Sequence, residues 1–161
     1  MKSVVSLIIA GAILFAVPAF AQTEASTDTN MEILMEKLKA DKKLLVASNM
    51  GLTDAEGKDF WPVYEAYQKD LQQVNERLGK TINAYAEAYN EGKGTVSNDT
   101  AKKLLDEAIS VEEQEVKLKR AYADKVAKVL PAAKTARYIQ IENKIRAVIK
   151  FELARQIPLV D

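Results

Sequence analysis

The sequence predicts an all-α protein built on a long antiparallel helical hairpin with shorter flanking helices, four helices in total. Three observations predict this fold class. Apolar residues recur at three- and four-residue steps over long stretches, and helix-capping residues stand where these stretches begin. A single loop rich in Gly, Ser, Asn and Asp separates the two longest stretches. No segment reads as a β-strand.

The first predicted helix begins near residues 28–30, where Asp and Asn side chains are available to cap it, and it ends at Gly51. Gly51 suits the left-handed residue that follows a last helical turn. One face of this helix is apolar apart from Lys42, its only polar member. The apolar members of the face are Met31, Leu34, Met35, Leu38 and Leu45.

The second predicted helix begins at Thr53, which forms a capping box with Glu56. Its apolar stripe advances 29 residues in eight steps, a mean of about 3.6 residues, as one straight α-helix requires. Pro62 lies two turns into the helix and is expected to kink it. Core packing is the expected role of the tyrosines and of Trp61, with ligand stacking as the alternative. The stripe consists of Phe60, Val63, Tyr67, Leu71, Val74, Leu78, Ile82, Tyr85 and Tyr89.

Residues 90–99 form the predicted loop, and a second long helix follows it. The apolar stripe of that helix, which runs from Ala101 through Leu105 to Val129, contains one acid, Glu115. Leu130-Pro131 interrupts the pattern, and Pro131 suits the first position of a last helix. A break there would turn the last helix back across the hairpin, whereas a bend would leave one long arm.

Residues 1–21 have the layout of a secretory signal peptide. Lys2 precedes an apolar run, and an A-x-A pattern ends at Ala21. The run is about 14 residues long, whereas a membrane-spanning helix, the alternative, needs roughly 20. We therefore expect cleavage between Ala21 and Gln22, with residues 22–29 as a flexible tail and residues 30–161 as a single helical domain.

The chain contains neither Cys nor His. The usual zinc, copper and haem ligands are therefore missing, and Ser-His-Asp and Cys-His nucleophiles are excluded. No calcium-loop motif appears either. Glu112, Glu113 and Glu115 are the densest carboxylate cluster, but neighbours on a helix point in different directions and do not form a facing acid–base pair. We predict no catalytic residue, no metal and no cofactor, and the protein is not expected to be an enzyme.

Formal charge is balanced overall, but its distribution is not. Residues 22–115 carry a net charge of −8 and residues 116–155 a net charge of +8. Such a split can indicate binding to a polyanion or a membrane surface. We favour a second interpretation, in which the two segments lie against each other as antiparallel helices and neutralise. Export makes nucleic acid a poor partner, and the acidic first two-thirds argues against membrane association.

Two helix starts in the chain share a layout. Leu52-Thr53-Asp54-Ala55-Glu56 begins one helix, and Leu130-Pro131-Ala132-Ala133-Lys134 begins another 78 positions later. This layout resembles the periplasmic LTxxQ family of Spy- and CpxP-like proteins, which carry two L-T-x-x-Q helix starts around a long helical hairpin. The first start has Glu56 in place of Gln, and the second lacks both the Thr and the Gln.

The resemblance covers about residues 30–155. It implies a cradle-shaped homodimer in the periplasm that acts as an ATP-independent chaperone, a stress-sensor partner or a metal-responsive protein. The metal-responsive members use His-rich segments, and this chain has no His. The resemblance therefore favours the first two roles.

The resulting functional hypothesis is an exported periplasmic helical binding protein, an ATP-independent chaperone or envelope-stress adaptor whose partners are protein clients or one envelope protein. The alternative is a structural or sensory partner module of an inner-membrane signalling protein, without general chaperone activity. The candidate binding surface lies on the last helix, where three cations project within about 20° of one another beside an apolar stripe. Ordinary packing of Arg and Lys stems along a core stripe is the alternative reading of this surface. Its residues are Arg137, Lys144, Arg155, Tyr138, Ile141 and Val148.

Overall fold

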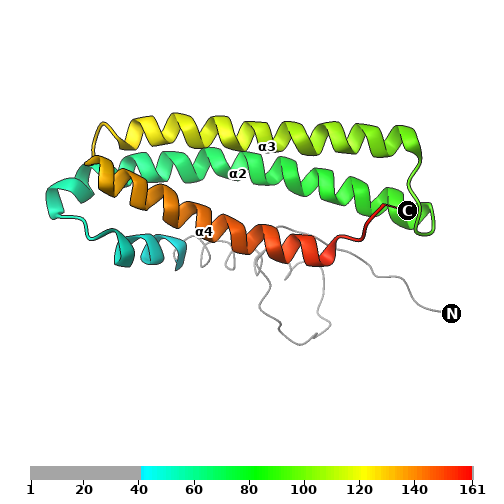
Figure 1. The fold of residues 1–161 in the computed structure, drawn as a ribbon, viewed down its shortest axis with the longest axis horizontal. Helices are drawn as coiled ribbons and strands as arrows, with labels where there is room; N and C mark the ends of the chain where they lie inside the picture. The colour runs from blue at the N-terminus through cyan, green and yellow to red at the C-terminus, as the bar shows by residue number, and fades with distance from the viewer. Residues whose placement is uncertain (1–40, 161) are drawn as a thin grey trace, which may run out of the picture.

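The computed structural model describes residues 41–160, which form four helices and contain no strand (Figure 1). A first helix covers residues 41–50. It is followed by α2 (Asp54–Glu91), α3 (Asn98–Val126) and α4 (Ala132–Gln156). The predicted all-α fold class with four helices is confirmed. The predicted signal peptide, the tail and the upstream apolar face (Met31, Leu34, Met35 and Leu38) lie outside the described residues.

The two longest helices, α2 and α3, lie side by side and run in opposite directions (Figure 1). The hydroxyl of Tyr122 on α3 donates to Asp70 on α2 at 2.6 Å. Further along α2, Arg77 meets Glu107, which lies earlier in α3. Because later residues of α2 meet earlier residues of α3, the pair is antiparallel.

The connection between α2 and α3 spans residues 92–97 and is shorter than the predicted loop of residues 90–99. Asn90 and Glu91 are still helical, so α2 extends further than its last apolar residue indicated. At the other end, the side chain of Ser97 accepts a hydrogen bond from the backbone N–H of Thr100 and so caps α3.

Helix α2 begins at the predicted capping box and continues through Pro62. The side chain of Thr53 accepts a bond from the backbone N–H of Glu56, whose carboxylate accepts one from the N–H of Thr53. Pro62 has no N–H to donate to the carbonyl of Lys58 four residues earlier. Both residues are exposed, so water can satisfy that carbonyl and the helix tolerates the proline.

The chain breaks at Leu130-Pro131 rather than bending there. Helix α3 ends at Val126, and Pro131, in extended geometry, is the residue before α4 rather than its first helical residue as predicted. Helix α4 then folds back along the other two helices (Figure 1). Within residues 41–160, no helix combines the length and the apolarity needed to cross a membrane.

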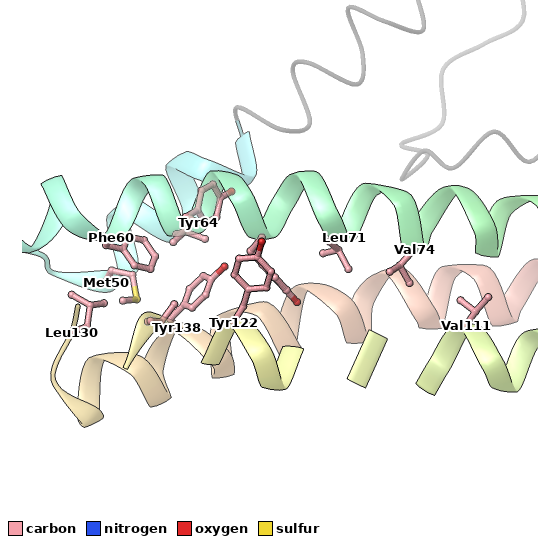
Figure 2. Close-up of a cluster of buried hydrophobic side chains, with 12 residues drawn as sticks. Met50, Phe60, Tyr64, Leu71, Val74, Val111, Tyr122, Leu130 and Tyr138 are labelled. Atoms are coloured by element: carbon pink, nitrogen blue, oxygen red, sulfur yellow. The ribbon is translucent and has the colours of Figure 1, made fainter. Parts of the chain in front are cut away.

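The buried core is concentrated at the end of the bundle where the first helix meets the starts of α2 and α4 (Figure 2). Aromatic rings fill most of it, with Phe60 and Tyr138 packed edge to face at 5.1 Å between centroids and Tyr67 lying 5.2 Å from Tyr122. Packing is therefore the role of these tyrosines. The core consists of Val46, Met50, Phe60, Tyr64, Tyr67, Leu71, Val74, Val111, Tyr122, Val126, Leu130 and Tyr138.

The apolar stripes agree with this core except at their edges. Tyr64, which the predicted stripe of α2 omitted, is buried between Phe60 and Tyr138. Leu105, which the stripe of α3 included, is 59% exposed. A stripe drawn one residue wide cannot identify such flanking positions, because a buried helical face is about 100° wide or more.

Candidate functional site

The outward face of α4 carries most of the predicted binding surface. Arg137, Lys144 and Arg155 are all exposed on it. Val148 lies between the last two cations, and its side chain is 57% exposed. At 100° per residue these four positions project within about 40° of one another. Together with Phe151, these four residues form a ridge along α4 that we call the basic ridge.

The other two predicted residues do not belong to the surface. Tyr138 is fully buried and contacts the rings of Phe60, Tyr64 and Tyr67. Ile141 is partly buried and packs against the same core. The structure therefore divides the predicted site, because Tyr138 and Ile141 lie on the side of α4 that faces the bundle.

Phe151 is the residue of the ridge that sequence reasoning missed. Its side chain is 63% exposed. It follows Val148 by three positions and precedes Arg155 by four, and this spacing places it on the same helical face. That spacing is present in the sequence, but the predicted surface took its apolar residues from the stripe of Tyr138, Ile141 and Val148 and so left Phe151 out.

The cations of α4 fall into two groups. Lys134, Arg146 and Lys150 pair with glutamates of the neighbouring helices, namely Glu56, Glu115 and Glu112, respectively. These pairs join the basic last helix to the acidic part of the chain. Within the described residues, the ridge cations Arg137 and Lys144 make no ion pair, whereas Arg155 contacts Glu152 at 3.2 Å.

The outward face of α4 also lacks exposed acids. Helix α4 contains two, of which Glu142 is buried and Glu152 is half-buried. The ridge is therefore a surface of positive charge with two large apolar side chains set among the cations. Such a surface attracts acidic segments over a range of about 10 Å at moderate ionic strength.

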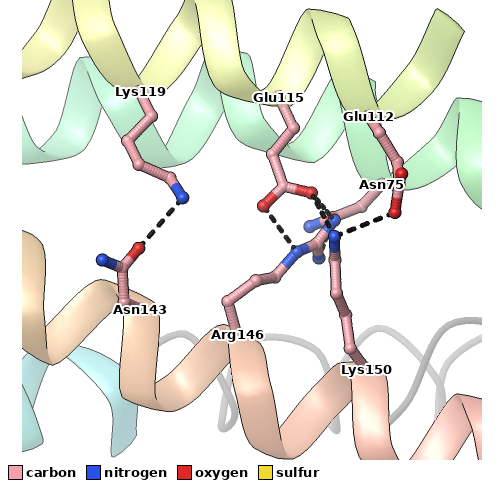
Figure 3. Close-up of polar contacts among 7 residues, drawn as sticks. All are labelled: Asn75, Glu112, Glu115, Lys119, Asn143, Arg146 and Lys150. Atoms are coloured by element: carbon pink, nitrogen blue, oxygen red, sulfur yellow. Dashed lines mark hydrogen bonds and ion pairs between the residues drawn. The ribbon is translucent and has the colours of Figure 1, made fainter. Parts of the chain in front are cut away.

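A buried ion pair fixes the position of α4 against α3 (Figure 3). The guanidinium of Arg146 donates to both carboxylate oxygens of Glu115 at 3.0 and 2.7 Å, and it also donates to Asn75 of α2 at 2.7 Å. Burial raises the pKa of Glu115, but the hydrogen bonds from Arg146 and the charges of Arg146, Lys150 and Lys119 outweigh it. The pKa of Glu115 is thus held below its usual value.

A second polar cluster joins the first helix to α2 and α4. Lys42 donates to Glu142 at 2.9 Å and to Gln68 at 2.7 Å, and Gln68 donates to the other carboxylate oxygen of Glu142 at 3.0 Å. The cluster closes a ring of three side chains over the aromatic core. It explains why a lysine stands on the apolar face of the first helix.

The hydroxyl of Tyr138 lies beside this cluster without joining it. It is buried and makes no hydrogen bond with any described residue. Burial and the nearby negative charge of Glu142 raise the pKa of Tyr138 far above its ordinary value. The hydroxyl of Tyr138 therefore stays neutral.

The two helix starts that resemble each other in sequence lie close together in space. Lys134, the fifth residue of the second start, forms an ion pair with Glu56, the fifth residue of the first. Lys134 also donates to the backbone carbonyl of Gly51 at 2.9 Å. The hydrogen bonds from Lys134 and from the backbone of Thr53 lower the pKa of Glu56.

The carboxylate cluster of α3 is dispersed in three directions. Glu115 points inward to Arg146, Glu112 contacts Lys150, and Glu113 contacts Lys117 on its own helix. Among the residues that the structure describes, no group of three or more Asp and Glu side chains is placed to hold a metal ion. The basic ridge is therefore the best candidate for a functional site.

Comparison with known proteins identifies no relative. The chain matches no family model, no curated protein and no solved structure.

Proposed function

We propose that the protein is an exported periplasmic binding protein that acts as an ATP-independent chaperone or envelope-stress adaptor. Its partners are protein segments that carry acidic and apolar residues, and it holds them on the basic ridge of α4. The signal-peptide pattern of residues 1–21 supports the location. The resemblance of the two helix starts to the LTxxQ family supports the class of protein.

The observation that carries this proposal is the composition of the basic ridge. Three cations and two large apolar side chains are exposed on one face of one helix. Of the two acids of that helix, Glu142 is buried and Glu152 is half-buried against Arg155. If the cations only edged a core stripe, the apolar residues beside them would be buried. Val148 and Phe151 are instead 57% and 63% exposed.

This composition suits transient binding of unfolded chains. Cations steer acidic segments towards the ridge, which raises the rate of association. The two apolar side chains bury only a small area against a client, so no single contact is strong. A client can therefore be held and released without ATP.

Suppression of aggregation tests the proposal. A test protein is diluted from denaturant with and without the purified chain, and light scattering is followed at low and high salt. We expect stoichiometric amounts to reduce scattering, and added salt to weaken the effect because exposed charges are screened. No suppression at stoichiometric amounts would count against chaperone activity.

A second candidate is a structural or sensory module that binds one inner-membrane signalling protein. The ion pairs between helices favour it, because Glu115–Arg146, Lys42–Glu142 and Arg77–Glu107 hold the bundle in a fixed shape. A fixed shape suits one defined partner. Under this alternative, a pulldown from envelope extracts would return one protein, and the aggregation assay would show no effect.

A further inference from the structure

The basic ridge repeats along α4 with the spacing of a coiled-coil contact. Counted from Lys144, the next members follow at steps of four, three and four residues, namely Val148, Phe151 and Arg155, and Arg137 precedes Lys144 by seven. All five are exposed. Alternating steps of three and four residues are the pattern of the heptad positions at which two packed helices meet. The ridge therefore has the spacing that one helix presents to another.

The side chains along one edge of the ridge leave room for a second helix. Gln140, Ala147 and Ala154 are exposed there and recur at seven-residue steps. Two of the three are alanines, and the distance between two packed helices depends on the size of the side chains at their contact. A partner helix can therefore approach the backbone of α4 closely at this edge.

The spacing of the ridge also favours a helical partner over an extended one. Ridge residues seven positions apart are separated by about 10.5 Å along α4, at 1.5 Å per residue. A partner helix places its own contact residues at the same interval, so the two sets stay in step over the whole ridge. On an extended strand, the side chains of one face recur about every 6.6 Å and fall progressively out of step.

The charges of the ridge select the chemistry of the partner. Arg137 and Lys144 occupy one end, Arg155 occupies the other, and Val148 and Phe151 lie between them. Within the described residues, neither Arg137 nor Lys144 makes an ion pair, and Arg155 contacts Glu152 of its own helix. A complementary surface carries acids opposite the three cations and apolar side chains opposite the two apolar ones.

We propose that the basic ridge binds acidic amphipathic α-helices, which pack along α4 with their acids opposite Arg137, Lys144 and Arg155. This inference rests on the proposed function, and it narrows the partner from acidic and apolar segments in general to segments that are helical when bound. The ridge is about 27 Å long, so a partner helix of about five turns covers it.

Synthetic peptides of equal composition test the helical conformation of the partner. In the first peptide, three Glu and two Leu residues are spaced to lie opposite the ridge residues when the two helices run antiparallel. A second peptide carries the same face for parallel packing. In the control peptide the same five residues stand at alternate positions, so that only an extended chain brings them to one side. Calorimetry with the exported chain at low salt measures binding, and circular dichroism of each mixture measures helix formation.

We expect one of the two helical peptides to bind about ten-fold more tightly than the control peptide and to gain helical signal when it binds. Equal affinities of all three peptides, or binding without a gain of helical signal, would overturn the helical partner. Binding of a chemically unfolded acidic protein is measured in parallel. If that protein binds while the helical peptides have no advantage, this inference fails alone, whereas loss of both kinds of binding refutes the proposed function as well.

Two double variants locate the binding surface. Val148→Ser with Phe151→Ser removes the apolar side chains of the ridge, and Leu105→Ser with Ile109→Ser removes two side chains of α3 that are 59% and 49% exposed. We expect the ridge double variant to bind the preferred helical peptide about five-fold more weakly, because its two apolar contacts are lost, with the α3 double variant unchanged. Equal affinities in the two double variants would overturn the assignment to the ridge.

Light scattering on size-exclusion chromatography tests whether a second copy of the chain is the occupant instead. We expect the mass of the unsubstituted chain and that of the ridge double variant to be the same. A dimer that only the ridge double variant converts to a monomer would show that a second copy occupies the ridge, and it would overturn the proposal.

Discussion

Glu115 of α3 and Arg146 of α4 form a two-bonded ion pair whose side chains are only 7% and 12% exposed. Glu115 stands in the apolar stripe of α3, where a large apolar residue would be expected from the spacing. Arg146 reaches Glu115 from α4, whose backbone comes close to that of α3 at only a few positions. The pair therefore fixes where the last helix lies along the hairpin.

We predict that Glu115→Ala lowers the free energy of unfolding by about 3 kcal/mol, because it leaves the guanidinium of Arg146 buried without a counter-charge. Urea unfolding followed by the fluorescence of Trp61 measures the change. Glu113→Ala is the matched control, since its partner Lys117 is exposed and such pairs contribute less than about 1 kcal/mol. Equal losses in the two variants would contradict the structural role of Glu115.

The lowered pKa of Glu115 predicts a dependence of stability on pH. In the folded protein this carboxylate stays charged below the ordinary glutamate pKa of 4.5. Its contribution to the free energy of unfolding is therefore present in full above about pH 4.5. The contribution is lost as the pH falls through the lower pKa of the folded state. Between about pH 5 and pH 3, we expect the melting temperature of Glu115→Gln to fall less than that of the unsubstituted protein. Parallel curves would rule out this role for Glu115.

Lys42 and its neighbour Lys43 should differ sharply in importance. Lys42→Met leaves the buried carboxylate of Glu142 without its cation, and we expect a loss of about 3 kcal/mol in the free energy of unfolding. Lys43 pairs with Glu65 at the surface, so Lys43→Met should cost less than about 1 kcal/mol. Chemical denaturation of the two variants checks this prediction, and a reversed order would be inconsistent with the buried cluster.

Two buried tyrosines should respond in opposite ways to removal of the hydroxyl. The hydroxyl of Tyr138 is buried without a hydrogen bond, so Tyr138→Phe should raise the free energy of unfolding by about 1 kcal/mol. The hydroxyl of Tyr122 donates to Asp70, so Tyr122→Phe should lower it by about the same amount. Loss of stability in both variants would show that the hydroxyl of Tyr138 has a hydrogen-bond partner.

Helix positions followed directly from local chemistry in the sequence. The capping box of Thr53 and Glu56 stands at the start of α2, and the regular spacing from Phe60 to Ile82 matches its buried face. Pro131 marked the start of α4 to within one residue. These features depend on residues close together in the chain, which a sequence displays without reference to tertiary structure.

The sequence did not reveal which residues far apart in the chain contact each other in the fold. Lys42 and Glu115 stood out as polar members of apolar stripes, but their partners, Glu142 and Arg146, lie 100 and 31 positions away. The same limit applies to the candidate site. Spacing grouped Tyr138 and Ile141 with the ridge cations, and only the position of α4 against the bundle shows that these two face the core.

Client binding by a ridge variant tests the proposed function most directly. The ridge variant combines Arg137→Gln, Lys144→Gln and Arg155→Gln. The control variant removes the same number of charges at exposed positions of α3, by Lys102→Gln, Lys117→Gln and Arg120→Gln. Affinity for a chemically unfolded acidic protein is measured at low salt. We expect the ridge variant to bind the unfolded protein about ten-fold more weakly than the unsubstituted chain does, because the loss of three exposed charges costs roughly 1.4 kcal/mol of binding free energy. The affinity of the control variant should be nearly unchanged. Equal affinities in the two variants would contradict a binding role for the outward face of α4.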